Sequence, residues 1–302
     1  GESGSAPYSE EERAYKGAGT DWIKTMTNTA FSQIHVLQAS AGTDLISGSA
    51  SITYQDDMGV VNNTNYSRYG TRANLEIRPN DKIKAGLNLN KLVSKNDYFG
   101  LDMNGGSDNL MYRMLIASPF NTLNEDGTNI FGEIAKREAV FYEIMYKDMN
   151  IITDNSAASA FLDLNLVEGL TLRAQYSLTN ENILSQNFHS KNTIYGSSYN
   201  GVAKISNARD TYHQAEGVAT YHKNFKGSHD FKMTAGVSYL MYSTETSSMT
   251  AHDFSTESMK YYNIGAAAAI DKIESLRQDK VNLSYFARAE YVLKDRYIFN
   301  AT

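Results

Sequence analysis

The sequence predicts an all-β protein: an antiparallel, up-and-down transmembrane β-barrel of which about ten strands are present. Three observations lead to this prediction. Segments of alternating apolar and polar residues recur from end to end. The connections between them alternate between tight and long. No stretch approaches the roughly 18 consecutive apolar residues of a membrane-spanning helix, which leaves strands as the elements that could cross a membrane.

The segment "DLISGSASITYQDDMGVV", residues 44–61, illustrates the alternation. One parity is mostly apolar and ends in an aromatic residue, whereas the other parity is hydroxylic or amidic. The first set comprises Ile46, Gly48, Ala50, Ile52 and Tyr54, and the second comprises Ser47, Ser49, Ser51, Thr53 and Gln55. A strand with this pattern has one apolar and one hydrated face, and in a barrel the apolar face meets lipid.

Nine further segments carry the same period of two, and several exceed the five or six residues common in soluble strands. They are residues 32–41, 68–78, 82–92, 159–167, 170–179, 213–223, 230–242, 281–293 and 297–302.

The connections divide the chain into residues 1–29, expected to be an extracellular loop with a short helix, and residues 30–302, expected to be the partial barrel. Tight turns alternate with longer connections, of which the three longest are expected at about 94–157, 185–207 and 244–280. An antiparallel meander then places all tight turns at one end, as in outer-membrane barrels with short periplasmic turns and long extracellular loops. Helices are expected within the loops, at residues 8–17, 107–119 and 131–148.

Composition narrows the possible functions. The net charge of -6 disfavours a nucleic-acid partner, and the absence of cysteine excludes a disulfide framework and a thiolate site. Tyrosine, at 21 residues, outnumbers phenylalanine at 12, which suits surfaces that are apolar at one end and wet at the other. The N-terminus shows no basic segment followed by an apolar one, so no signal peptide is identified.

An ordered set of short motifs resembles the barrel of SusC/RagA-type TonB-linked outer-membrane transporters of Bacteroidetes. The resemblance covers nearly the whole chain, with Ala41 and Ser67 as conservative departures. Its early motifs are Thr20-Asp21-Trp22, Gln33-Ile34-His35, Ala41-Gly42-Thr43-Asp44, Tyr54, Gly59-Val60-Val61 and Ser67-Arg68-Tyr69. Its late motif runs through Ser284, Tyr285, Arg288, Tyr291, Asp295, Arg296 and Tyr297.

This resemblance implies an outer-membrane active transporter that imports oligosaccharides or peptides. The partners it implies are a SusD-like lipoprotein over the extracellular face, the TonB complex acting through a plug, and outer-membrane lipid. Because no plug or TonB box is recognised, and because such barrels have about 22 strands, the chain is expected to be the N-terminal half of a barrel. The alternatives are a siderophore-type TonB-dependent receptor and a soluble β-sheet adhesin or carbohydrate-binding module.

No motif for bond chemistry stands out, so the protein is expected not to be an enzyme and to need no cofactor or metal. None of the six histidines has a recognised ligand spacing. The loop from Asp102 to Asn109 lacks the spacing of an EF-hand, and Asp56-Asp57 lies beside a turn. No nucleophile elbow or phosphate-binding loop occurs.

Two groups of residues are candidates for contact with cargo. Charged residues on the polar parity of the strands are expected to face the lumen, because charge is costly against lipid: Arg72, Glu76, Arg173, Arg288 and Glu290. Tyrosines in the long loops are candidate substrate or partner contacts: Tyr195, Tyr199, Tyr261 and Tyr262.

Overall fold

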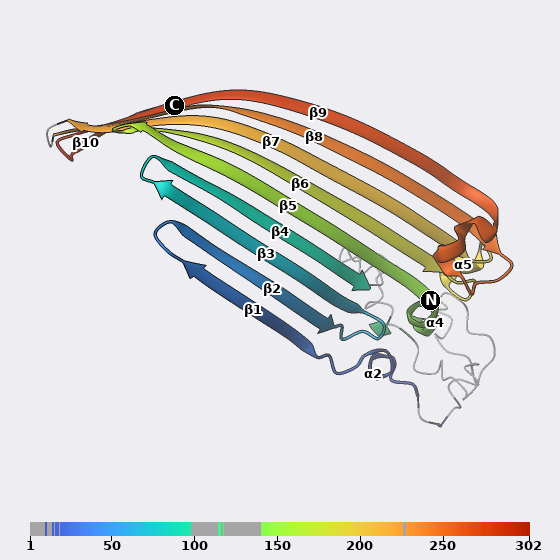
Figure 1. Ribbon diagram of the computed structural model, residues 1–302. Helices are drawn as coiled ribbons and strands as arrows, with labels where there is room; N and C mark the ends of the chain where they lie inside the picture. Colours follow the sequence, from blue (N-terminus) through green and yellow to red (C-terminus); the bar gives the residue numbers. More distant parts are fainter. Residues whose placement is uncertain are drawn as a thin grey trace, which may run out of the picture.

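The protein forms one antiparallel sheet of ten strands, and the spatial order of the strands follows the chain from β1 to β10 (Figure 1). This computed structural model describes Glu10, Ala14 and residues 16–17, 19–97, 114–115, 117, 140–225 and 228–302. The predicted all-β meander is therefore confirmed. Its strands are β1 (Ser32–Gly42), β2 (Ile46–Met58), β3 (Asn65–Asn80), β4 (Ile83–Asp97), β5 (Lys147–Val167), β6 (Leu170–His189), β7 (Val202–Phe225), β8 (His229–Phe254), β9 (Ala267–Leu293) and β10 (Tyr297–Ala301).

Tight turns and long loops lie at opposite ends of the sheet, which we call the turn end and the loop end (Figure 1). At the turn end, Val167 and Leu170 are joined through Gly169, whose φ is +83°. A Cβ at this glycine would lie 2.3 Å from the carbonyl oxygen of His222, so only glycine fits this turn.

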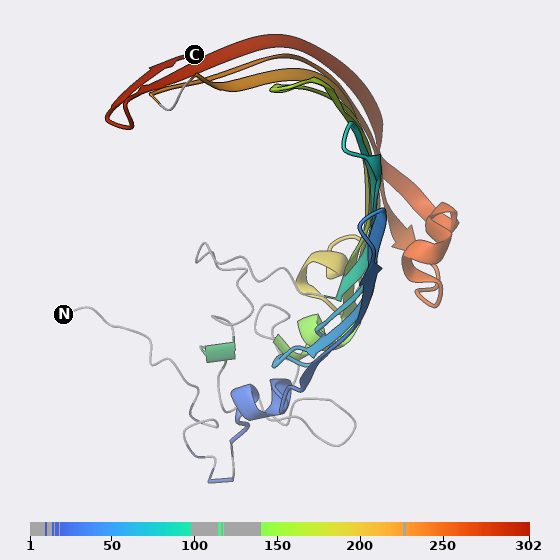
Figure 2. The same cartoon turned by 60° about the vertical axis from the view of Figure 1, so that its left-hand side comes forward.

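The sheet curves into a trough (Figure 2). Its two faces differ in the side chains that they carry. The 3-10 turn η1 (Lys260–Ala266), drawn in orange, lies on the convex side, where Tyr261 packs with Phe188 and Ala203. Along β7, Ala203 shares its parity with Ala215 and the other apolar positions, and the pairing of β7 has no register shift. The apolar parity therefore forms the convex face, and the polar parity forms the concave face.

The convex apolar face is a band that stops part of the way along the strands. On β5 to β9 its last register row is apolar apart from a histidine: Ala158, Leu178, His213, Met241 and Val281. The second convex row beyond it toward the loop end is polar throughout: Asp154, Asn182, Arg209, Glu245 and Arg277. In the band, Leu283 and Tyr285 are 56% and 77% exposed, and no second layer of the described structure covers them. An exposed apolar band of this kind favours a wall that faces lipid over a soluble sandwich.

The strands continue beyond the band, and this corrects the predicted loop bounds. The loop between β4 and β5 was expected at about 94–157. It is shorter than that, because β4 ends at Asp97 and β5 begins at Lys147. The loops expected at 185–207 and 244–280 are likewise reduced to residues 190–201 and 255–266. The cause is that both faces of a strand carry polar residues where no lipid is present, so the alternation used to find strands disappears.

The few helices lie at the loop end. α2 (Trp22–Met26) begins at Asp21, whose carboxylate accepts a hydrogen bond from the backbone N–H of Lys24 at 3.0 Å. α4 (Val140–Tyr146) confirms part of the helix expected at 131–148. Most of residues 8–17 and 107–119, the other expected helices, lies outside the described residues. No helix in the described ranges has the length and apolar composition that a membrane crossing requires.

Two small apolar clusters stabilise the loop end. One joins α2 to α4 through Trp22, Met26, Val61, Met114 and Ile144. The other, beneath η1, contains Phe188, Ala203, Phe254 and Tyr261. These clusters, rather than a central core, contain nearly all of the fully buried apolar side chains of the described residues.

Candidate functional site

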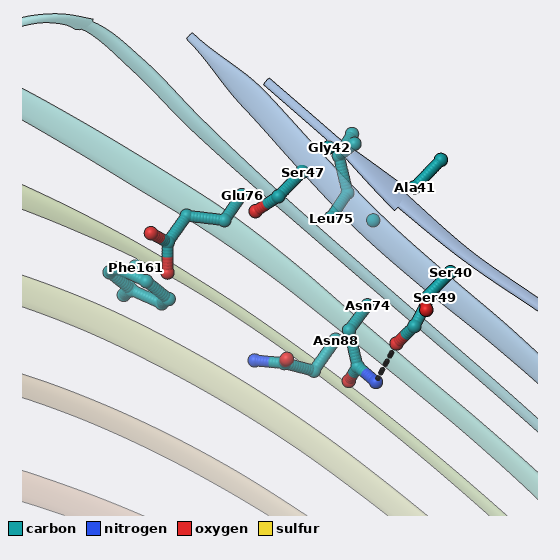
Figure 3. Close-up of a pocket in the computed structure, with 11 residues that line it drawn as sticks. Ser40, Ala41, Gly42, Ser47, Ser49, Asn74, Leu75, Glu76, Asn88 and Phe161 are labelled. Carbon is teal, nitrogen blue, oxygen red and sulfur yellow. Dashed lines mark hydrogen bonds between the residues drawn. The ribbon is translucent and has the colours of Figure 1, made fainter. Parts of the chain in front are cut away.

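The concave face near the turn end contains a hollow of about 540 Å³ across β1 to β5 (Figure 3). Three serines and two asparagines line it beside small and apolar residues, and Asn74 Nδ2 donates to Ser49 Oγ at 3.1 Å. The ring of Phe161 and the carboxylate of Glu76 stand on the same face in the close-up. Such a surface offers hydrogen-bond donors and acceptors to a polar solute, without a reactive group.

Ion pairs neutralise the charges beside this hollow. Arg173 donates two hydrogen bonds to Asp163, at 2.6 and 2.7 Å, and Glu76 pairs with Lys84 at 2.8 Å. The guanidinium of Arg173 also lies 4.8 Å from the centre of the Phe161 ring. These contacts hold the side chains of Arg173 and Glu76 in defined positions on a wet surface.

All five charged residues singled out from the sequence lie on the concave parity. Glu76 faces the hollow, and Arg173 lies in the adjoining register row. Arg288 and Glu290 are successive concave positions on β9, with 3.5 Å between their charged groups. Arg72 forms no ion pair with the described residues.

Two tyrosines that the sequence reasoning did not single out form a stacked pair on the concave face, nearer the loop end than the hollow. Tyr212 of β7 lies opposite Tyr242 of β8, with 4.6 Å between ring centres and 21° between ring planes. Tyr242 donates a hydrogen bond to Asp210 at 3.1 Å. The signal was available, because both tyrosines fall on the polar parity of their strands.

At the loop end, four aromatic rings form a continuous chain that we call the mouth aromatics. It runs from His189 through Tyr195 and Tyr199 to His252, with ring centres 5.2, 5.4 and 5.2 Å apart. Tyr195 belongs to α5 (Ile194–Ser197), which begins at Thr193 and lies on the concave side in Figure 2. Tyr195 and Tyr199 are 49% and 43% exposed, so their faces are open to a solute.

Burial gives His189 an unusually low pKa. Desolvation, with a smaller contribution from the Lys147 ammonium, lowers the pKa of His189 from 6.5 to about 4. The Nδ1 atoms of His189 and His252 are buried and have no hydrogen-bond partner among the described residues. His189 is therefore neutral near pH 7.

The other two candidate tyrosines lie apart from the mouth aromatics, on the convex side. Tyr261 is 3% exposed, and its hydroxyl accepts a hydrogen bond from Asn150 at 2.8 Å, so contact with cargo is excluded in this conformation. Its neighbour Tyr262 is 72% exposed. In the described ranges, no group of three or more His, Asp or Glu residues is placed to hold a metal ion.

Comparison with known proteins gives consistent matches to one class. No family model matches the chain. It is 24% identical over 290 residues to TonB-dependent receptor P3 of Formosa agariphila, and 22% identical over 313 residues to TonB-dependent receptor P26 of the same bacterium. These alignments cover 94% and 96% of this chain but only 29% and 30% of the two receptors. The chain thus spans about a third or less of the relatives it matches.

The fold is also that of solved outer-membrane barrels. The structure of the RagAB peptide transporter matches 93% of this chain with a TM-score of 0.74 and 20% identity, and this chain covers 32% of it. The ferripyoverdine receptor of the outer membrane of Pseudomonas aeruginosa matches 86% of the chain with a TM-score of 0.55 and 13% identity. At these identities the structures show a shared fold, and together with the sequence relatives they confirm the resemblance.

Proposed function

We infer that this chain, a section of an outer-membrane β-barrel of the SusC/RagA type, serves in the TonB-dependent import of an oligosaccharide or a peptide. The observation that carries the proposal is the difference between the two faces of the sheet. The convex band is apolar and faces lipid, whereas the concave face carries the polar hollow and ends in the mouth aromatics. Such a wall passes a hydrated solute and breaks no bond.

The five concave charged residues, Arg72, Glu76, Arg173, Arg288 and Glu290, face the lumen in this proposal. Arg173 and Glu76 are held by ion pairs and keep the wall hydrated. Tyr195 and Tyr199 make the first contact with cargo, because sugar rings and peptide side chains both stack on open tyrosine faces. A SusD-like lipoprotein would deliver cargo to this end, and TonB would supply the energy for passage through the whole transporter.

A siderophore receptor is the second candidate, because ferric siderophore receptors share the fold. Their TM-scores, 0.51 to 0.55, are below the 0.72 to 0.74 of the RagAB structures. The relatives in sequence come from a Bacteroidetes bacterium, which also favours the SusC/RagA type.

The proposal is tested by uptake in cells that carry the whole transporter. We expect uptake of a labelled oligosaccharide or peptide pool to stop when TonB is deleted. Tyr195→Ala and Tyr199→Ala should each reduce uptake at limiting cargo by roughly tenfold, because an open aromatic contact is lost. Tyr262→Ala is the matched control: it removes an exposed tyrosine from the convex side and should leave uptake unchanged. Uptake that persists without TonB contradicts the proposal, and iron-dependent growth that requires the protein would favour the siderophore receptor.

A further inference from the structure

The stacked tyrosines of β7 and β8 lie among carboxylates that have no cationic partner. Asp210 accepts a hydrogen bond from Tyr242, Glu181 accepts one from Asn155 at 3.1 Å, and Glu216 accepts one from Gln214 at 2.7 Å. None of these three carboxylates forms an ion pair with any described residue, whereas Asp163, lower on the same face, is paired with Arg173. Glu181 and Asp210 are opposite each other in the row next to the tyrosines, whereas Glu216 lies three concave rows from Asp210. We call Tyr212, Tyr242, Glu181 and Asp210 the tyrosine–carboxylate panel.

Lysine and arginine are absent from the concave strand positions of β5 to β8 around the panel. Four rows of paired concave residues cross β5 to β8 here. They begin on β5 at Asn155, Ala157, Ser159 and Phe161, and the structure describes all of their positions. None of these concave positions is Lys or Arg. The nearest cation in register is Lys280 of β9, opposite Tyr242 at the border of the panel, and it forms no ion pair with the described residues.

This combination favours one kind of ligand. A Lys ammonium or Arg guanidinium is attracted both to the face of a tyrosine ring and to carboxylates. Glu181 and Asp210 lie directly opposite each other without an ion-pair partner, so they repel each other, and a cationic group relieves that repulsion. A neutral sugar would satisfy hydrogen bonds at the panel but would leave the repulsion in place. The open face of Tyr212, 37% exposed, is accessible from the trough.

We propose that the tyrosine–carboxylate panel binds cationic side chains of the cargo, so that peptides carrying Lys or Arg are among the imported molecules. This inference rests on the proposed import function and narrows it. The panel lies farther from the loop end than the mouth aromatics, on the same face of the sheet, so cargo would meet it after passing Tyr195 and Tyr199.

The test uses the whole transporter, purified in detergent, and calorimetric titration with the peptide Lys-Gly-Lys-Gly-Lys. We expect binding that weakens as salt increases, and a loss of affinity of about tenfold when the lysines are acetylated. The double variant Glu181→Gln, Asp210→Asn should lose a similar factor. Glu245→Gln is the matched control, because it removes one carboxylate from β8 on the opposite, convex face, where Glu245 pairs with Arg277 at 3.0 Å.

The outcomes distinguish the proposed role of the panel from the proposed import function. Equal affinity for the acetylated peptide, or an unchanged affinity in the double variant, overturns the assignment even if TonB-dependent uptake of a neutral oligosaccharide continues. Tyr242→Phe keeps the ring and removes the hydroxyl, so it should retain most of the affinity, whereas Tyr242→Leu should not. Peptide binding that depends on the panel in a protein without TonB-dependent uptake supports the panel and contradicts only the proposed function.

Discussion

At the scale of single residues, position on the trough decides what a side chain can do more than its type does. Tyr195 and Tyr261 were equivalent candidates in the sequence, yet the structure leaves one open at the mouth and buries the other beneath a convex loop. The mouth aromatics join His189 to His252, which lie 63 positions apart in the chain, counted from their numbers. Sequence reasoning could find the tyrosines of α5 but not the histidines that extend them, because that contact depends on the register of three strands.

His189 gives the mouth a pH dependence whose direction follows from its pKa. The pKa of about 4 in the folded state is below the ordinary 6.5, so the unfolded loop takes up a proton first as the pH falls. The folded mouth keeps its full stability above about pH 6.5, where His189 is neutral in both states. It loses stability as the pH falls toward 4, because protonation of His189 then favours the unfolded loop. We therefore expect residues 190–201 to open progressively over that interval, measured as hydrogen exchange corrected for the intrinsic rate.

Two variants isolate the contribution of His189. His189→Leu removes the titrating group and should flatten the pH profile of exchange at residues 190–201. His213→Gln replaces a histidine of the convex face, hydrogen-bonded to Tyr176 at 2.7 Å, and should leave the profile as it was. The same profile in wild type and His189→Leu would show that another group opens the loop.

At the scale of elements, the loop of residues 255–266 acts as a strap over the convex face. Lys260 pairs with Asp148 at 2.6 Å, and Tyr261 contacts both Asp148 and Asn150 of β5. At its start, Glu257 accepts hydrogen bonds from Ser190 Oγ and the backbone N–H of Lys191, at 2.7 and 2.6 Å. The strap thus ties β5, the β6–β7 loop and β8 together where no lipid supports them.

Two substitutions of Tyr261 should destabilise the strap to different extents. Tyr261→Phe removes the hydrogen bonds and should cost about 1 kcal/mol of local stability. Tyr261→Ala also removes a buried ring and should cost roughly 3 kcal/mol. Limited proteolysis at residues 255–266 measures both, with Met259→Ala, at a strap residue that is 52% exposed, as the control. Uptake that falls in proportion to ring loss while the strap stays protease-resistant would instead place Tyr261 in cargo contact.

The strands also show where the alternation of apolar and polar residues predicts structure and where it does not. Inside the band each predicted strand was found, because lipid on one side and water on the other impose a strict period of two. Beyond the band the segments from Met149 to Asn155 and from Thr244 to Phe254 are strands that the sequence reasoning assigned to loops. Their outward positions, such as Asp154 and Glu245, meet water, so nothing in the residue types distinguishes one face from the other.

At the scale of the whole molecule, the boundary of the convex band fixes the depth of the barrel in the membrane. An arginine within the band should cost about 2–4 kcal/mol, falling to about 0–1 kcal/mol near its edge. We expect Leu87→Arg, in mid-band on β4, to impair insertion strongly. Thr211→Arg, in the first polar convex row of β7, should be tolerated. The measurement is the heat-modifiable folded fraction in outer-membrane preparations, and equal effects of the two substitutions would contradict this placement of the band.

The extension of β5 to β9 beyond the band also bears on how such a protein can change over generations. Within the band, half of the strand positions must remain apolar, so most inherited substitutions there are harmful. On the extension between the band and η1 both faces are wet, as in β8 from Ser243 to Ser248, so either face accepts polar residues. The outward face of the extension is therefore the part of these strands with the greatest freedom to vary. Such a barrel can alter its outward surface while the inward surface, on alternate residues of the same strands, stays unchanged.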